Sequence, residues 1–257
     1  MRKSNHTYSC RRGFTLIELS IVLVIIGLIV GGVLVGQDLV RAAEVRGVVT
    51  DLQKFHTAIM AFKDKYQCLP GDCVNATNFF GTDSNGCPTG GGATGTCNGN
   101  GNEQIEWGTE NFRAWQQLAL AQLIAGNFTG IAAASGTPDV ISVNVPASLT
   151  VPGMGFDFIY NQNNWNVSTY VGNRIAFGGV SATSGSTWEG ILTPKEMFSI
   201  DTKMDDGLPS SGIFTVSRGA SYSGLMACVD AWVTATTYNY ILSDNTKSCH
   251  GSYWWDQ

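Results

Sequence analysis

The chain has 257 residues, 44% of them hydrophobic, and a formal net charge of −5. This length suits one large domain or two small ones. The acidic balance argues against general nucleic-acid binding, which needs Lys and Arg to neutralise phosphates. Three His are present and no nucleophile motif surrounds them, so an enzyme is not expected.

The first thirteen residues form a short basic segment, and an apolar run over 14–36 follows it directly. Removing the four cations of this segment from the net charge of −5 would leave the rest of the chain at −9. About 20 apolar residues are enough to cross a bilayer as a helix. The basic end predicts that residues 1–13 stay in the cytoplasm and that the long C-terminal part lies outside. The four cations are Arg2, Lys3, Arg11 and Arg12, and the polar residues within the apolar run are Thr15, Glu18 and Ser20.

The apolar run differs from a secretory signal peptide, in which small residues for cleavage follow the apolar core. Here the expected cleavage point, between Gly13 and Phe14, lies before the run, so the run would be retained. Glu18 argues against a simple anchor. A carboxylate deep in a bilayer costs roughly 2.5 kcal/mol or more and marks a functional contact. The amine of Phe14 after cleavage, in the same or a neighbouring copy, is a suitable partner for it.

The stretch Gly13-Phe14-Thr15-Leu16-Ile17-Glu18 resembles the processing motif of type IV prepilins and type II secretion pseudopilins. The resemblance covers residues 11–36. It implies that prepilin peptidase cleaves after Gly13 and that Phe14 becomes the methylated N-terminus. It also implies that Glu18 pairs with the N-terminus of an adjacent subunit during assembly.

Residues 37–66 are predicted to continue the helix as an amphipathic segment. Their apolar side chains recur at spacings of three and four, which places them on one face. No break precedes Pro70, so one helix of about 80 Å is expected from Phe14 to about Tyr66. Residues 14–36 would lie in lipid or a filament core, and 37–66 would pack against a head formed by 67–257. The apolar face comprises Val45, Val48, Leu52, Phe55, Ile59, Phe62 and Tyr66.

Six cysteines remain outside the leader, which contains Cys10. An even number in an exported domain predicts three disulfides. The sequence alone leaves several connectivities open, and we expect the local one, which pairs each cysteine with its neighbour along the chain. A zinc site is not expected, because the spacings do not suit it. The expected pairs are Cys68–Cys73, Cys87–Cys97 and Cys228–Cys249.

Residues 67–108 are rich in loops, and residues 98–106 alternate oxygen-bearing side chains as in an EF-hand-type calcium loop. The pattern departs from that loop twice, because Glu103 replaces the turn glycine and Thr109 replaces the bidentate Glu. Two interpretations remain open: an array of Asx turns without an ion, or a calcium site. Secretion pseudopilins are similar in using calcium in their heads. The candidate calcium ligands are Asn98, Asn100, Asn102 and Glu106.

The rest of the head is expected to contain two helices and a sheet. One helix would begin after Thr109 and end at Gly126. Another would begin at Thr193, with Pro194 in its first turn and Glu196 completing a capping box. Six short β segments are predicted between turns, at 140–145, 155–160, 174–177, 212–216, 226–232 and 237–242. The resulting fold class is α+β, with a long N-terminal helix packed on an antiparallel sheet, as in type IV pilins.

Two further features of the head leave alternatives open. Asp201, Asp205 and Asp206 lie at the end of the second helix, where they either cap backbone amides in a turn or need a cation. The aromatic stretch 253–255 either forms a sugar- or protein-binding patch or closes the core.

The sequence therefore indicates a structural subunit, a minor pilin or pseudopilin, of a type IV pilus or type II secretion-like filament. Its implied partners are prepilin peptidase, other pilin or pseudopilin subunits and the inner membrane. The implied location is the bacterial inner membrane with the head in the periplasm, and then a filament or the cell surface. An alternative is an adhesin-like pilin whose large head binds a surface, a glycan or an exported protein.

Overall fold

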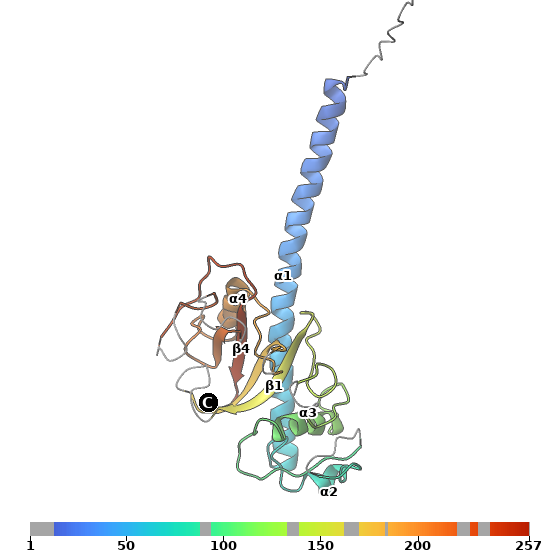
Figure 1. Ribbon diagram of the computed structural model, residues 1–257, viewed down its shortest axis with the longest axis vertical. Helices are drawn as coiled ribbons and strands as arrows, with labels where there is room; N and C mark the ends of the chain where they lie inside the picture. The colour runs from blue at the N-terminus through green and yellow to red at the C-terminus, as the bar shows by residue number, and fades with distance from the viewer. Residues whose placement is uncertain are drawn as a thin grey trace, which may run out of the picture. The chain divides into compact units, whose positions relative to one another are not determined.

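The computed structural model describes residues 13–87, 94–132, 139–161, 170–182, 185–219, 227–230 and 237–256. The chain divides into two compact units, Met1–Ala42 and Ala43–Gln257. One α-helix, α1 (Leu16–Tyr66), passes through both units (Figure 1). The predicted single long helix is thereby confirmed, although it begins two residues after Phe14.

The first unit consists, in its described part, of residues 13–15 and the first half of α1. This half of α1 is long and apolar enough to cross a membrane. None of the described residues 13–42 is buried. Positions 27, 31, 32 and 36 are glycines, and a Cβ atom at any of them would meet nothing within 4 Å. No neighbouring atom within the described chain therefore requires a glycine at these four positions.

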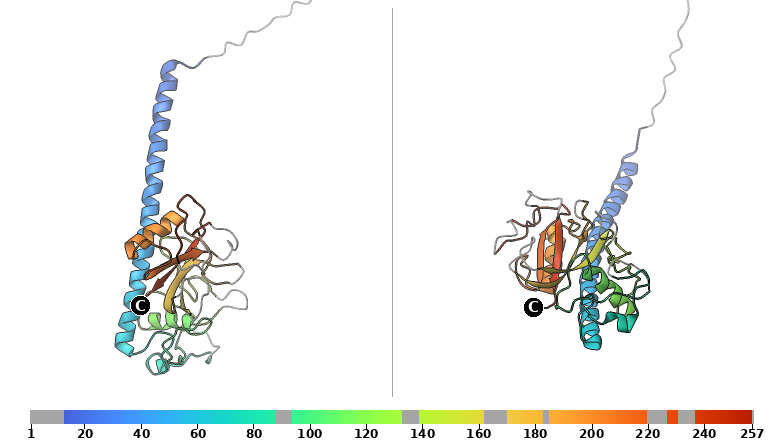
Figure 2. Two further views of the ribbon diagram at one scale, coloured as in Figure 1. Left: turned by 90° about the vertical axis from the view of Figure 1, so that its left-hand side faces the viewer. Right: turned by 60° about the horizontal axis from the view of Figure 1, so that its bottom comes forward.

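The second unit is built around a four-stranded antiparallel sheet with the strand order β1-β2-β4-β3. Strand β4 comes last in the sequence, yet it lies between β2 and β3. In Figures 1 and 2 the sheet lies beside the second half of α1, with α3 toward one end and α4 toward the other. The strands are β1 (Met154–Asn161), β2 (Gly172–Gly179), β3 (Phe214–Arg218) and β4 (Cys249–Trp254), and the helices are α2 (Ala76–Phe80), α3 (Glu110–Leu120) and α4 (Pro194–Met204).

The core lies between the inner face of the sheet, α1 and α3, and aromatic rings fill its centre. Phe55 of α1 packs edge-on against Trp115 of α3, with ring centroids 4.9 Å apart, and against Phe156 of β1 at 5.0 Å. Trp115 stacks on Phe158 at 4.0 Å. The predicted apolar face of α1 is confirmed, because six of its seven residues are buried and Tyr66 is half-buried: Val45, Val48, Leu52, Phe55, Ile59 and Phe62.

Three of the predicted β segments correspond to β1, β2 and β3. The predicted strands at 140–145 and 237–242 were wrong, because these segments make only isolated bridges. Ser142 has φ +68°, and the Asn144 side chain accepts a hydrogen bond from the amide of Val140 at 2.6 Å, so 140–145 is a turn. The predicted strand 226–232 lies partly outside the described residues, and 227–230 contain one bridge, at Val229.

Strand β4 was not predicted. Its burial distinguishes between the two interpretations of the aromatic stretch 253–255, a binding patch or a part of the core. Tyr253, Trp254 and Trp255 are 5%, 1% and 8% exposed. Tyr253 and Trp254 belong to the strand, and Trp255 packs edge-on against Phe158 with centroids 5.4 Å apart. These aromatics therefore close the core.

The described residues form three disulfides, in the local pairing: Cys68–Cys73, Cys87–Cys97 and Cys228–Cys249. The third bond joins β4 to the segment 227–230. The α4 prediction is also confirmed, since Thr193 and Glu196 form the capping box and Pro194 stands in the first turn. Helix α3 begins after Thr109 as predicted, but the Thr109 side chain makes no capping hydrogen bond, and the helix ends at Leu120 instead of near Gly126.

Candidate processing and assembly site

The candidate site at the start of α1 is formed by Gly13, Phe14, Thr15 and Glu18. Gly13, Phe14 and Thr15 precede the helix and are exposed, and Phe14 is 84% exposed. The peptide bond between Gly13 and Phe14 thus lies outside regular secondary structure. A bond in such a segment is accessible to a peptidase, whereas a bond inside a helix is held in the helical hydrogen-bond pattern.

Thr15 and Glu18 exchange hydrogen bonds across the first turn of α1. The Thr15 amide donates to Glu18 Oε2 at 2.8 Å, and the Glu18 amide donates to Thr15 Oγ1 at 3.3 Å. The Thr15 hydroxyl also donates to Glu18 Oε2 at 2.8 Å. This reciprocal pattern is a capping box, which satisfies amides that the helix leaves without partners.

The capping box gives Glu18 a role within its own chain that the sequence analysis did not consider. The sequence does contain the capping-box pattern here, which is a Thr followed three residues later by a Glu before an apolar run. Glu18 remains exposed in the described chain. Its carboxylate therefore accepts hydrogen bonds locally and is still accessible to a second chain.

The loop 98–106, the candidate calcium loop, is organised by two carboxylates from outside it. Asp72 accepts hydrogen bonds from three successive amides, those of Gly101, Asn102 and Glu103, at 2.5–3.1 Å. Glu110 accepts the amides of Asn100 and Glu106 at 3.0 and 3.1 Å. Burial raises the pKa of both carboxyls, and these hydrogen bonds oppose the rise.

The Asn side chains of this loop bond mainly to backbone amides. Asn98 Oδ1 accepts the Thr77 amide at 2.9 Å, Asn100 Oδ1 accepts the Asn102 amide at 3.0 Å, and Asn102 Oδ1 accepts the Gln104 amide at 2.9 Å. Asn102 Nδ2 donates to Glu106 Oε1 at 3.2 Å. The bonds that Asn100 and Asn102 accept from amides two residues further along form two successive Asx turns. The sequence analysis named these four residues and missed Asp72 and Glu110, which bind the loop amides.

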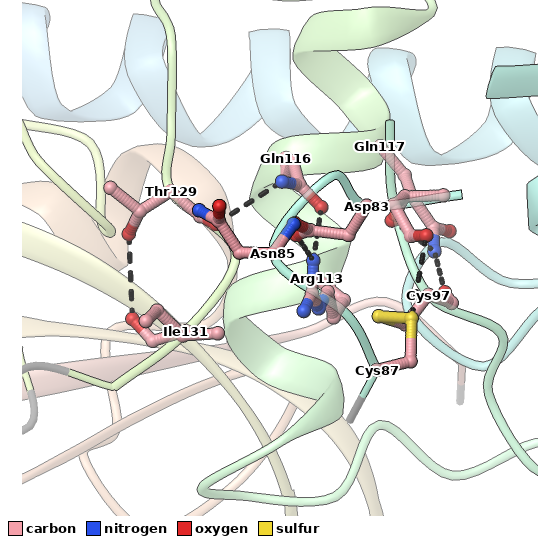
Figure 3. Close-up of polar contacts among 10 residues, drawn as sticks. Asp83, Asn85, Cys87, Cys97, Arg113, Gln116, Gln117, Thr129 and Ile131 are labelled. Atoms are coloured by element: carbon pink, nitrogen blue, oxygen red, sulfur yellow. Dashed lines mark hydrogen bonds and ion pairs between the residues drawn. A yellow bond between two sulfur atoms is a disulfide. The ribbon is translucent and has the colours of Figure 1, made fainter. Parts of the chain in front are cut away.

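A buried ion pair fixes the neighbouring loop to α3 (Figure 3). Arg113 donates to Asp83 at 2.8 Å and to Gln116 at 3.0 Å, and the Arg113 and Asp83 side chains are 6% and 0% exposed. Gln117 donates to the Cys97 carbonyl at 3.2 Å. The loop that the Cys87–Cys97 disulfide closes is therefore attached to α3 by polar contacts.

The three aspartates at the end of α4 cap backbone amides, as one of the two interpretations predicted. Asp201 accepts the Gly207 amide at 3.1 Å and the Tyr240 hydroxyl at 2.6 Å. Asp206 accepts the Leu208 amide at 2.8 Å, and Asp205 accepts the Phe214 amide at 3.2 Å. Their oxygens lie within 4.8 Å of one another.

Comparison with known proteins identifies the N-terminal segment. Residues 8–34 match the family described as the prokaryotic N-terminal methylation motif. This is the prepilin-type signature, and it supports a pilin-like or pseudopilin-like subunit. No curated protein and no solved structure is significantly similar to the chain. The match covers about a tenth of the sequence, so it characterises the start of the chain and not its head.

Proposed function

We propose that this protein is a structural filament subunit, a minor pilin or pseudopilin of a type IV pilus or type II secretion-like filament. The observation that carries the proposal is the prepilin-type signature at residues 8–34, which leads directly into the apolar half of α1. In this function the apolar half is held first by the inner membrane and then by neighbouring subunits. The disulfide-bonded head lies in the periplasm, where disulfides form and persist.

The buried aromatic stretch 253–255 weighs against the adhesin alternative. The size of the head and these three aromatics were the features that favoured it. Because the aromatics lie in the core, they offer no exposed platform for a glycan or a protein. The filament subunit is therefore the better supported of the two functions.

The proposed function requires processing between Gly13 and Phe14. We expect mass spectrometry of the membrane form to find Phe14, N-methylated, at the N-terminus. Replacing Gly13 by Val is expected to leave the leader attached, because a branched side chain would then stand directly before the cleaved bond. The matched control is Gly31→Val, which changes the same residue type inside α1 and should be processed normally. A wild-type chain that still begins at Met1 in a strain with active prepilin peptidase would refute the proposal.

A further inference from the structure

The second half of α1 carries an exposed stripe on the side away from the core. Its residues recur at spacings of three and four, which places them on one face of the helix. Its charged members, Arg46 and Lys54, are both cations. The carboxylates of this part of α1 lie off the stripe, since Glu44 is half-buried and Asp51 is buried. We call this surface the basic stripe, and it comprises Ala43, Arg46, Thr50, Gln53, Lys54 and Thr57, all exposed.

The basic stripe is also smooth. The Thr50 hydroxyl donates to the Arg46 carbonyl at 2.9 Å, and the Thr57 hydroxyl donates to the Gln53 carbonyl at 2.8 Å. Because both hydroxyls are bonded within the helix, each threonine leaves its methyl group for an outside contact. The stripe therefore offers a small apolar surface together with two positive charges.

The cations of the stripe are not neutralised within the described part of the chain. Arg46 forms no ion pair with a described carboxylate. The charge of Lys54 acts on Asp51 across one turn of α1, but the two form no ion pair. Both cations are therefore available to carboxylates of another molecule.

A surface of the opposite charge lies at the end of α4. Phe198 and Leu208 are 37% and 49% exposed. The Phe198 ring packs edge-on against Tyr240, with centroids 5.6 Å apart. The chain passes this ring at Gly207, where a Cβ would lie 3.3 Å from Phe198 Cε2, so Leu208 is next to the ring. We call this surface the acidic patch, and it comprises Phe198, Asp206, Leu208, Asp230 and Tyr240.

Hydrogen bonds hold both carboxylates of the acidic patch in place. Asp206 accepts the Leu208 amide and the Ser211 hydroxyl, both at 2.8 Å. Asp230 accepts the Asn239 amide at 2.7 Å, and its other oxygen accepts Asn239 Nδ2 at 3.1 Å. The bonds from Asn239 lower the pKa of Asp230, which is therefore charged at neutral pH. A carboxylate has about four lone-pair sites, so each can still accept a cation, and a fixed carboxylate loses little freedom on pairing.

The two surfaces lie toward the same end of the head. Helix α4 is near the end at which α1 enters the head (Figures 1 and 2), and the basic stripe begins at Ala43, the first residue of the second unit. Parallel copies standing side by side would thus present the stripe and the patch at similar heights. Because the two surfaces differ, the contact between them is heterologous, and each copy keeps one surface free for the next. Such contacts build an open filament when the rotation between copies does not close.

We propose that the basic stripe of one copy docks on the acidic patch of a second copy of this chain. This inference rests on the proposed function, the filament subunit. The two cations of the stripe pair with the two carboxylates of the patch, and the methyl groups of the stripe cover Phe198 and Leu208. The occupant is a second copy because one chain carries both complementary charges and both apolar parts.

The test expresses full-length variants at equal levels in a strain without the native copy, and compares sheared filaments with membranes. One variant combines Arg46→Glu with Lys54→Glu, and another combines Asp206→Lys with Asp230→Lys. Each should be cleaved after Gly13, yet its recovery in filaments should be at least about tenfold lower than that of wild type. A variant with all four substitutions has complementary charges again, so its recovery should return toward the wild-type level.

The matched control combines Lys63→Glu with Lys65→Glu, the same change of charge on α1 outside the stripe, and it should assemble normally. The stripe is exposed, so its substitutions leave the core intact. If the variant with Arg46→Glu and Lys54→Glu reaches filaments like wild type, the proposal fails, whether or not the patch variant folds. It also fails if the variant with all four substitutions forms its disulfides but is recovered no better than the double variants, because the partner is then another protein. A wild-type chain that is processed but absent from filaments would refute the proposed function itself, which distinguishes the two failures.

Discussion

At the scale of single residues, Glu18 combines two roles that can be separated. Its carboxylate completes the capping box with Thr15. The resemblance to prepilins implies that it also pairs with the N-terminus of a neighbouring subunit. Gln has the same shape and retains an acceptor oxygen for the Thr15 amide but carries no charge. Ala removes both the acceptor and the charge.

We expect both Glu18→Gln and Glu18→Ala to be cleaved after Gly13. The fraction of each variant recovered in filaments should be at least about tenfold lower than that of wild type. A lost contact of about 1.4 kcal/mol already changes an equilibrium tenfold. The measurement compares sheared filaments with membranes at equal expression. Assembly that is normal for Glu18→Gln and impaired for Glu18→Ala would mean that the cap matters and the charge does not.

The sequence identified Gly13, Phe14 and Glu18 through local motifs, and these residues lie together at the start of α1. It did not identify Asp72, because an acceptor of three loop amides some thirty residues away depends on how the loop folds back. The same limit applies to the hydrogen bond from the Thr187 amide to Asp139, which depends on how two loop segments pack together.

At the scale of elements, α1 shows two different uses of glycine. Gly47 lies where α1 meets the loop at Thr150, and a Cβ at position 47 would overlap the Thr150 side chain. The Thr150 hydroxyl also approaches the Glu44 carbonyl at 3.4 Å. Gly47 is therefore needed for close packing within the head, in contrast to the unhindered glycines of the apolar half.

Gly47→Ala should lower the free energy of unfolding of the head by about 1–3 kcal/mol, the usual cost of overpacking. Gly31→Ala is the matched control, and it should leave the melting temperature of the head unchanged. Thermal unfolding followed by near-ultraviolet circular dichroism measures both. Adding Thr150→Ala should relieve part of the loss in Gly47→Ala, because it removes two of the overlapping atoms. Equal melting temperatures for wild type and Gly47→Ala would contradict the close packing.

Helices were easier to predict than strands in this chain. The spacing of apolar residues specifies α1, and Thr193-Pro194-Lys195-Glu196 specifies the start of α4, because both signals are local. Strand β4 is buried on both faces, so it lacks the alternation of polar and apolar residues that marks a half-buried strand. The segment 140–145 has such alternation, but the Asn144 side chain turns it back on itself.

At the scale of the whole molecule, the three disulfides differ in the length of chain they close. The sequence separations are 5 for Cys68–Cys73, 10 for Cys87–Cys97 and 21 for Cys228–Cys249. A disulfide that closes a longer loop restricts the unfolded chain more. The Cys228–Cys249 bond also holds β4, the strand that links β2 to β3.

Replacing both Cys228 and Cys249 by Ala should therefore destabilise the head most, by about 3 kcal/mol. Replacing Cys68 and Cys73 by Ala is the control with the shortest loop and should cost least. Urea unfolding of these two double variants, and of a third that replaces Cys87 and Cys97 by Ala, gives the order. A larger loss for the Cys68–Cys73 variant than for the Cys228–Cys249 variant would contradict this ranking.

The position of β4 has a consequence for biogenesis. Because β2 and β3 both pair with residues 249–254, the sheet stays in two separate parts until these residues have been translated and exported. A polypeptide interrupted after β3 but before residue 249 would expose the edges of both parts and the core beneath them. Such an edge invites aggregation or degradation. Proteolysis would thus remove incomplete chains, and the head would reach its native state only after translocation of this segment.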